Sequence, residues 1–257
     1  MAAKGIADHI VTWLCDYVEA SGLDGFVVGV SGGIDSAVTS TLCAHTGKPV
    51  LAVTMPIHQD PDQVTLADEH LAWLDARFDN VETRTIPLTP VFEALEAHLP
   101  SDAQDTLTMA NTRSRLRMLT LYACAGGHRR LVAGTGNKVE DFGVGFYTKY
   151  GDGGVDLSPI ADLMKSEVYA VAAELGVIDG IQQAAPTDGL WDDGRTDEGQ
   201  IGASYDELEW AMAFDGDEAA LSARQREVLA IYRRFHAANK HKMLPIPVCE
   251  IPGALRG

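Results

Sequence analysis

One stretch of the chain concentrates residues that can bind a phosphate group. Residues 29–36 read GVSGGIDS, and they lie between a short apolar run and a segment with helical spacing. Glycines allow positive φ and a close approach of the backbone, so successive N–H groups can surround an anion. A helix that begins here would direct its positive end at the same place, and Ser31 and Ser36 would add hydroxyl donors. The stretch predicts an anion-binding loop rather than an ordinary glycine turn, which needs neither the two hydroxyls nor the carboxylate of Asp35.

Asp35 narrows the chemistry of this loop. A carboxylate inside a phosphate loop would repel the anion unless a Mg²⁺ ion lay between them. The other role for an aspartate here is a helix N-cap, and one side chain could serve both. The chain has no GxxxxGK[ST] sequence, and Gly134-Thr135-Gly136 lacks the third glycine of GxGxxG. Neither a kinase-type loop nor a dinucleotide-binding loop is therefore predicted.

Strands and helices alternate over the first half of the chain. Short apolar runs predict strands at residues 26–30, 49–54 and 131–133, and alternating apolar residues predict a strand at 81–86. Helical spacing is found at residues 6–17, 37–45, 64–78, 91–98 and 106–124. This alternation predicts an α/β fold, with a doubly wound, mostly parallel sheet flanked by helices. In such a sheet the loop at 29–36 lies at the carboxyl end of a strand, where ligands usually bind.

The pattern changes after about residue 140. Residues 143–154 are rich in glycine and aromatic side chains, which predicts a loop. Residues 186–202 are polar and glycine-rich, which predicts a mobile surface loop able to act as a lid. Further helices are predicted at residues 165–175, 205–214 and 218–239.

The composition limits the classes of partner. The 257 residues are 46% apolar, enough for a substantial core, and we predict one domain over residues 1–257. Twenty Lys and Arg stand against 37 Asp and Glu, so a nucleic-acid partner is not expected. No apolar run is long enough to span a bilayer, and the four cysteines form no CxxC pair. A cytoplasmic protein without a membrane or nucleic-acid partner is predicted.

GVSGGIDS resembles the pyrophosphate loop of the N-type ATP pyrophosphatases. Four further motifs resemble one family in that group, the ammonia-dependent NAD⁺ synthetases: NTRSRLRM at 111–118, GTGNK at 134–138, GFYTKYGDGG at 145–154 and SYDE at 204–207. The resemblance runs in order from about residue 5 to about residue 245. It implies a Rossmann-like fold and the ATP-dependent amidation of deamido-NAD⁺ with ammonia, the last step of NAD biosynthesis. The implied products are NAD⁺, AMP and pyrophosphate, formed through an adenylated carboxylate.

The resemblance also implies roles for the residues that match its motifs. ATP would be bound by Gly29, Val30, Ser31, Gly32, Gly33, Ile34, Asp35, Ser36, Thr135, Lys165 and Thr187. Asp35 and Lys165 would be catalytic, with Lys165 stabilising charge as pyrophosphate leaves. Asp35 and Glu140 would hold Mg²⁺, and Asp141 is an alternative to Glu140. A solvated lysine is the other interpretation of Lys165, but a helix's first turn disfavours a cation.

Contacts to deamido-NAD⁺ are implied for Arg115, Lys149, Asp156, His241 and Lys242. A dinucleotide with a pyrophosphate bridge needs cations for its phosphates and polar groups for its ribose hydroxyls. Arg113, Arg115 and Arg117 would point to different sides of a helix, so at least one of them should be solvated or ion-paired. A basic C-terminal tail is the alternative interpretation of His241 and Lys242.

The nitrogen donor follows from the position of the motifs. Because they begin by residue 29, no room is left for the amidase domain of glutamine-using members, and free ammonia is the expected donor. A separate glutaminase subunit stays compatible with the sequence. The resemblance also implies a homodimer, and the helix at 106–124 would face a partner or the core.

Two other classes of protein stay in competition. Another ATP pyrophosphatase, such as a thiolating enzyme, would need a persulfide cysteine, for which Cys43 is the only candidate near the loop. A non-catalytic module that binds adenine nucleotides would keep the fold without turnover.

Overall fold

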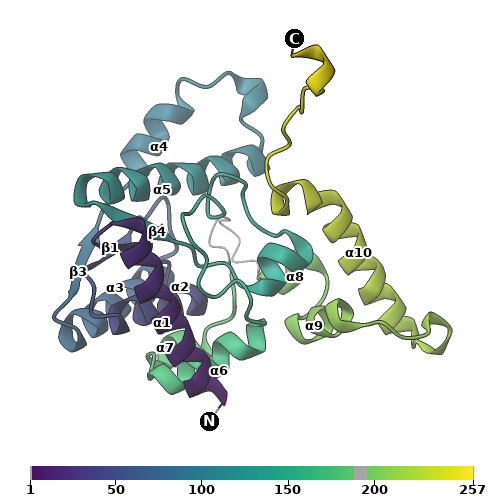
Figure 1. Ribbon diagram of the computed structural model, residues 1–257, viewed down its shortest axis with the longest axis horizontal. Helices are drawn as coiled ribbons and strands as arrows, with labels where there is room; N and C mark the ends of the chain where they lie inside the picture. Colours follow the sequence, from purple (N-terminus) through teal and green to yellow (C-terminus); the bar gives the residue numbers. More distant parts are fainter. Residues whose placement is uncertain (1, 188–195, 257) are drawn as a thin grey trace.

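The computed structural model describes residues 2–187 and 196–256 and contains a parallel sheet with helices on both faces (Figure 1). The four strands are β1 (Gly25–Gly29), β2 (Val50–Thr54), β3 (Val81–Thr85) and β4 (Arg130–Ala133). Their spatial order is β3-β2-β1-β4. The chain moves outward from β1 to β3 and then returns to β4 on the other side of β1, which opens a crevice at the carboxyl ends of β1 and β4. The predicted α/β fold with a parallel sheet is confirmed.

The register explains why the sequences of β1 and β2 are continuously apolar. Phe26 of β1 is aligned with Val50 of β2 and Leu131 of β4, and Val27 is aligned with Leu51 and Val132. Successive residues point to opposite faces, and both faces are covered by helices. The central strands β1 and β2 therefore bury nearly every side chain, whereas residues 82–85 of the edge strand β3 are exposed or half-buried.

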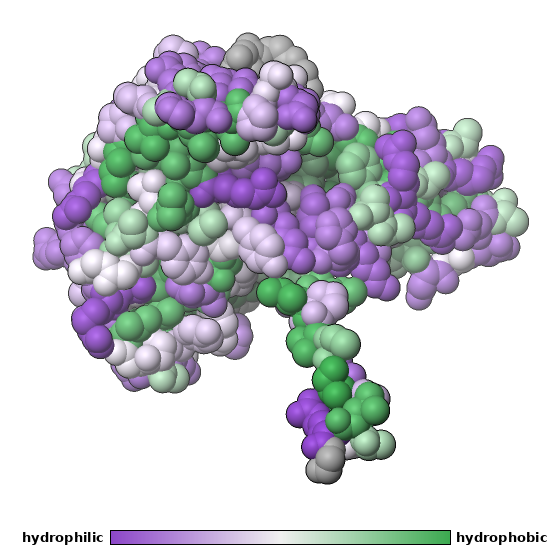
Figure 2. Space-filling model, turned by 90° about the horizontal axis from the view of Figure 1, so that it is seen from above, coloured by the Kyte–Doolittle hydropathy of each residue, from purple (hydrophilic) through white to green (hydrophobic). Residues whose placement is uncertain are grey.

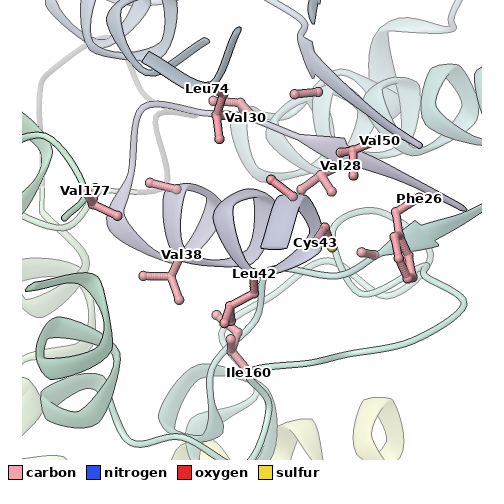
Figure 3. Packing of buried hydrophobic residues seen from close by; sticks show 14 of the residues in the cluster. Phe26, Val28, Val30, Val38, Leu42, Cys43, Val50, Leu74, Ile160 and Val177 are labelled. Carbon is pink, nitrogen blue, oxygen red and sulfur yellow. The ribbon is translucent and has the colours of Figure 1, made fainter. Parts of the chain in front are cut away.

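One face of the sheet packs against four helices. These are α1 (Ala2–Ser21), α2 (Ile34–His45), α3 (Pro61–Arg77) and α6 (Lys165–Leu175). Figure 3 shows Phe26 and Val28 of β1 near Cys43 of α2, while Leu42 on the other side of α2 points toward Ile160. This packing fixes α2, and with it the loop that joins β1 to α2.

The other face packs against two helices, α4 (Thr89–Glu96) and α5 (Thr106–His128). Val27, Leu51 and Val132 of the sheet meet Phe92 of α4 and Leu116 of α5 in this second apolar layer. The sheet is therefore wound with helices on both sides, as the alternating pattern predicts.

The later part of the chain builds a small cluster with its own apolar core. Its elements are a π-helical turn (Val139–Val144), α8 (Asp197–Ile201), α9 (Tyr205–Ala213) and α10 (Ala223–Met243). Shorter elements elsewhere are α7 (Asp179–Gln183) and the 3-10 turns Ser101–Ala103, Glu218–Ala220 and Gly253–Leu255. Residues 244–256 leave α10 as an arm that stands clear of the body, with hydrophobic residues along it (Figure 2).

Several predicted boundaries are wrong. The helix predicted at 218–239 begins at Ala223, because the Ser222 hydroxyl accepts the Gln225 N–H and caps it there. The helix predicted at 37–45 begins at Ile34, directly after the glycine pair of the loop. The loop predicted at 186–202 contains α8, while residues 188–195 lie outside the described residues. Helices of five residues are missed because they contain too few turns to show a period.

Every helix of the described residues is too short or too polar to cross a bilayer.

Candidate active site

The predicted phosphate loop lies directly after β1, at the carboxyl edge of the sheet. Gly32 has φ +88°, and a Cβ there would lie 2.7 Å from the Gln63 carbonyl oxygen, so only glycine fits. The Ser31 Oγ accepts the Gly33 N–H at 3.2 Å, and the Ser36 Oγ accepts the Ser31 N–H at 3.1 Å. Both serines therefore shape the loop itself, and α2 starts where the loop ends.

A cavity of about 300 Å³ opens beside the loop. Its lining includes the predicted ATP and metal residues Gly29, Val30, Ser31, Gly32, Gly33, Ile34, Asp35, Ser36, Thr135, Glu140, Asp141, Lys165 and Thr187. These residues come from segments far apart in the chain. The structure brings all of the residues predicted to bind ATP to one cavity at the crevice between β1 and β4.

Lys165 lies between two carboxylates of this cavity. Its Nζ is 2.6 Å from Asp35 Oδ2 and 2.9 Å from Glu140 Oε1, and its side chain is only 4% exposed. Burial lowers the pKa of Lys165, but the two carboxylates more than offset burial and raise its pKa above the usual range. Lys165 is therefore a buried cation at the first residue of α6, and the interpretation as a solvated lysine is wrong.

Asp35 does not cap α2. The N-cap position is Gly33, and the Asp35 carboxylate turns to Lys165 and to Asn137 instead. Burial raises the pKa of Asp35, while Lys165 acts in the opposite direction. The carboxylate is thus held at the cavity wall by contacts from two other segments.

Asn137 is a functional residue that sequence reasoning missed. It is fully buried, and its Nδ2 donates to Asp35 Oδ1 at 2.9 Å. Its Oδ1 accepts the N–H groups of Val139 and Glu140 at 3.0 and 3.1 Å. One amide therefore fixes Asp35 relative to the turn that carries Glu140. The signal was available in the GTGNK motif, where a polar residue follows a glycine turn at the carboxyl end of β4.

Tyr205 and Asp197 were also missed. The Tyr205 hydroxyl lies 2.6 Å from Glu140 Oε1 and 3.2 Å from Asp197 Oδ2, and its ring lies 4.7 Å from Lys165 Nζ. Burial and the neighbouring carboxylates raise the pKa of Tyr205, so the phenol keeps its proton and is a donor. The SYDE motif contains Tyr205, but only the fold places it beside Glu140.

The donors at this site fit Mg²⁺. Asp35 and Glu140 both contact the single ammonium group of Lys165, so these three side chains carry excess negative charge that a divalent ion would neutralise. Carboxylate oxygens are hard ligands of the kind that Mg²⁺ binds. No group of three or more such side chains within residues 2–187 and 196–256 is arranged to hold a metal alone. Mg²⁺ at this place would therefore complete its shell with phosphate and water.

Asp141 has a different environment from Glu140. It lines the large cavity and a smaller one of about 160 Å³, next to Gly136, where any Cβ would collide with its carboxylate. Burial raises the pKa of Asp141 well above its usual range, and Glu140 adds to this effect. Glu140 shares Lys165 with Asp35, whereas Asp141 does not, so the geometry favours Glu140 as the second metal carboxylate.

The basic residues predicted to contact the dinucleotide gather beside the loop at 145–151. The Arg115 Nε donates to the Lys149 carbonyl at 3.3 Å, and the Lys149 Nζ donates to the His241 carbonyl at 2.9 Å. The Lys242 Nζ donates to the Gly145 carbonyl at 2.9 Å, and Lys242 lines the smaller cavity. Four of the five predicted residues are thus linked around one loop.

Asp156 is placed differently. Its Oδ1 accepts the Tyr122 hydroxyl at 3.0 Å, and its Oδ2 accepts the Val132 N–H at 2.8 Å. It lines neither of the two cavities. The structure therefore ties Asp156 to α5 and β4 and does not bring it into the basic group.

The three arginines of α5 have separate roles. Arg115 is exposed, as expected for at least one of them. Arg113 lies over the Phe92 ring at 5.1 Å. Arg117 donates to the Met55 carbonyl at 3.0 Å and lines the large cavity, so it is a further site residue that sequence reasoning missed.

A glycine loop at the strand-order reversal of a parallel sheet, with buried carboxylates facing it, defines a nucleotide-binding α/β protein. The chain matches the NAD synthase family over residues 6–243 and belongs to that family. The resemblance inferred from the motifs, and with it the prediction of an enzyme, is confirmed.

Individual relatives agree with this assignment. The NH(3)-dependent NAD(+) synthetase of Methanosarcina acetivorans is 37% identical over 254 residues, covering 95% of this chain and 97% of the relative. The NMN synthetase structure from Francisella tularensis aligns with TM-score 0.86 and 33% identity, over 98% of this chain and 99% of that chain. The NH3-dependent NAD synthetase structure from Campylobacter jejuni aligns with TM-score 0.79 and 25% identity, over 97% and 100%.

Proposed function

We propose that the protein uses ATP and ammonia to convert deamido-NAD⁺ to NAD⁺, with AMP and pyrophosphate as the other products. This is the last step of NAD biosynthesis. The observation that carries the proposal is the meeting of the glycine loop, Asp35, Glu140 and Lys165 in one cavity. Membership of the NAD synthase family supports the choice of substrates.

The first step activates the nicotinate carboxylate, which resists ammonia because its leaving group would be oxide. A carboxylate oxygen attacks the α-phosphorus of ATP, and the bond from that phosphorus to the β-bridging oxygen breaks. Pyrophosphate leaves with the electron pair. Lys165 and the Gly32 N–H would bind the oxygens on which charge develops.

The second step forms the amide. Ammonia attacks the carbonyl carbon of the adenylate, the bond from that carbon to the AMP oxygen breaks, and the nitrogen loses a proton. An acyl-adenylate open to solvent would be hydrolysed, so the cavity must exclude water. Thr135 and Thr187 line this cavity and would orient the nucleotide.

Asp35 and Glu140 are the residues that would hold Mg²⁺. The bound ion would neutralise charge on the triphosphate, which a loop containing a carboxylate could not otherwise accept. Lys165 contacts both carboxylates, so binding the nucleotide would draw its ammonium group toward the phosphates.

Deamido-NAD⁺ would bind where Arg115, Lys149, His241 and Lys242 gather. The side chains of Arg115, Lys149 and Lys242 donate to backbone carbonyls, which leaves their positive charge for the phosphates of the dinucleotide. Asp156 would accept a ribose hydroxyl.

The direct test is a product assay with the purified protein, ATP, Mg²⁺, deamido-NAD⁺ and ammonium. We expect NAD⁺, AMP and pyrophosphate in equal amounts. Formation of ADP, or the absence of NAD⁺, would reject the proposal.

A second candidate substrate is nicotinic acid mononucleotide. The likeness to the Francisella tularensis NMN synthetase favours it, because that alignment has the higher TM-score of the two structures, 0.86 against 0.79. Both acids present the same nicotinate carboxylate, and only the dinucleotide carries an AMP half. The two acids should be offered at equal concentration; a higher kcat/KM for the mononucleotide would replace deamido-NAD⁺ in the proposal.

Two alternative functions were a thiolating enzyme and a non-catalytic nucleotide-binding module. Cys43 is fully buried in α2, and burial raises the pKa of its thiol, so it is a poor persulfide carrier for a thiolating enzyme. A non-catalytic nucleotide-binding module would bind ATP in the product assay without releasing pyrophosphate.

We further propose a single synthetase domain over residues 1–257 that uses free ammonia, acting as a homodimer in the cytoplasm. Leu107 and Leu119 on α5 are 60% and 62% exposed, which supports α5 as a dimer contact. The four cysteines are free, which supports a reducing compartment. Replacing Leu119 by Glu should shift the mass measured by light scattering from dimer to monomer.

A further inference from the structure

Tyr205 connects the metal carboxylate Glu140 to the later part of the chain. It is the first residue of α9 and is 6% exposed. Its backbone N–H donates to Glu198 Oε1 at 2.8 Å, and its hydroxyl lies between Glu140 and Asp197. Both polar groups of Tyr205 are therefore bound, and the residue is fixed from two sides.

The hydroxyl is directed at one particular oxygen. A phenol has a single proton to donate, and Glu140 Oε1 at 2.6 Å is closer than Asp197 Oδ2 at 3.2 Å. A short hydrogen bond to a carboxylate is a strong one. Tyr205 is therefore a donor to Glu140 first.

Glu140 receives its two short hydrogen bonds on the same oxygen. Oε1 accepts from Lys165 at 2.9 Å and from Tyr205 at 2.6 Å, and the Asn137 side chain also interacts with the Glu140 carboxylate. Glu140 lines the large cavity, so its carboxylate can contact a ligand there.

Lys165 cannot hold Glu140 throughout the reaction. The same ammonium group contacts Asp35 and, in the proposed function, moves toward the departing phosphates. Glu140 would then lose the Lys165 hydrogen bond and keep the short one from Tyr205 on Oε1. The Tyr205 hydroxyl, unlike the ammonium group of Lys165, is not needed to contact the nucleotide.

We propose that Tyr205 is a positioning residue, whose hydroxyl holds Glu140 in place for Mg²⁺ while Lys165 contacts the nucleotide. The inference rests on the proposed function, because it takes Glu140 as a metal ligand and Lys165 as a nucleotide contact. Tyr205 itself touches neither the substrate nor the reacting atoms in this account.

The test compares Tyr205→Phe with the unchanged chain. Mn²⁺ is the probe, and its binding is measured by electron paramagnetic resonance in the presence of an ATP analogue with a methylene α,β-bridge. Loss of one charge-assisted hydrogen bond should weaken Mn²⁺ binding about tenfold. In the turnover assay the Mg²⁺ concentration for half-maximal rate should rise by the same factor, with an unchanged KM for deamido-NAD⁺.

Tyr232→Phe is the matched control. Tyr232 is partly buried in the same apolar cluster as Tyr205, and none of the hydrogen bonds among the described residues involves its hydroxyl. The same chemical change there should alter neither Mn²⁺ binding nor the Mg²⁺ requirement.

A double-mutant cycle identifies the residue through which Tyr205 acts. In a Glu140→Gln background, Tyr205→Phe should cause little further loss of Mn²⁺ affinity. In an Asp197→Asn background, the tenfold effect should persist. Unchanged Mn²⁺ affinity in Tyr205→Phe with a native circular dichroism spectrum would overturn the inference, as would an equal loss with and without Glu140.

The two proposals fail separately. If the unchanged protein makes no NAD⁺ while Tyr205→Phe still loses Mn²⁺ affinity, the proposed function falls and the positioning role stands. If NAD⁺ forms and Tyr205→Phe leaves Mn²⁺ affinity unchanged, the proposed function stands and the positioning role of Tyr205 is rejected.

Discussion

Two regions of this protein have net charges of opposite sign. Around the glycine loop, Asp35 and Glu140 both contact the ammonium group of Lys165 in a buried cluster. Around the loop at 145–151, Lys149 and Lys242 donate to backbone carbonyls, and no ion pair of theirs occurs among the described residues. The first region has excess negative charge and the second has unneutralised positive charge.

The difference indicates what each region binds. A buried cluster with more carboxylates than cations is completed by a cation, whereas cations held by carbonyls are completed by an anion. A Mg²⁺ ion and a dinucleotide phosphate are the groups that the proposed reaction would supply to them. A protein with a formal charge of −17 can bind an anionic substrate because a few cations are concentrated at one place.

The largest effect should come from removing the cation of the first region. Lys165→Met leaves Asp35 and Glu140 buried together, which should lower the free energy of unfolding by about 3–5 kcal/mol and abolish turnover. Added Mg²⁺ should restore part of that stability, because it supplies the missing positive charge. Urea unfolding with and without Mg²⁺ measures both effects.

Lys138→Met is the control for that variant. The Lys138–Asp162 pair is on the surface, with side chains 37% and 96% exposed. Its loss should change the free energy of unfolding by less than about 1 kcal/mol. Equal effects of the two substitutions would show that the Lys165 cluster is no different from a surface pair.

The stability of helix α2, which follows the glycine loop, should also depend on pH through its contact with His70. His70 is fully buried and its Nε2 lies 2.9 Å from the Ser40 Oγ of α2, and burial lowers the pKa of His70 to about 4. His70 takes up a proton less readily in the folded protein than in the unfolded chain. Its contribution to the free energy of unfolding is therefore fully present above the pKa of the unfolded state, and it is lost as the pH falls toward the pKa of the folded state. The loss between about pH 6.5 and pH 4 should be about 3 kcal/mol.

His70→Gln separates this contribution from other acid effects. Glutamine can keep a hydrogen bond to Ser40 but does not titrate. Unfolding followed at several pH values should show a shallower dependence over that range than the unchanged protein. Identical slopes would remove His70 from the explanation.

The second region should show a smaller and selective effect. Lys149→Gln and Lys242→Gln each remove one cation, which should raise the KM for deamido-NAD⁺ about tenfold and leave the KM for ATP unchanged. The KM for deamido-NAD⁺ of the unchanged protein should rise with salt, and less so in the variants. An equal rise in both KM values would contradict the division of the site into two regions.

The smallest effect is expected at a charged pair outside both regions. Arg224 contacts Glu207 at 2.7 Å and lowers its pKa to about 2. The stability from this pair is present above the ordinary pKa of a glutamate and is lost as pH falls toward 2. Both side chains are substantially exposed, so Glu207→Gln should cost less than about 1 kcal/mol at neutral pH, with no change in Mg²⁺ requirement.

Local patterns predicted much of the fold. The strands β1 and β2 are continuous apolar runs because helices cover both faces of the sheet, and α6 spans Lys165–Leu175 as predicted, with Gly176 in the left-handed region at its end. Short helices such as α7 and α8 were missed because five residues show no period. The predictable elements are those whose burial repeats along the chain.

The site was predictable only in part, because its hydrogen bonds join distant residues. The glycine loop is contiguous and could be recognised, but Asn137 acts on Asp35 from 102 positions away and Tyr205 acts on Glu140 from 65. No spacing in the sequence encodes these pairings, which arise only when β1, β4 and α9 meet. The burial of Lys165, whose partner Asp35 is 130 positions away, depends on the same assembly.

A crystal of the protein grown with Mg²⁺ and an ATP analogue tests the central claim most directly. The account predicts the triphosphate against residues 31–36, with the metal between its phosphates and the carboxylates of Asp35 and Glu140. Lys165 should have turned from Glu140 toward the phosphates, and the Tyr205 hydroxyl should still contact Glu140. A nucleotide bound elsewhere, with the glycine loop unoccupied in that crystal, would contradict the account.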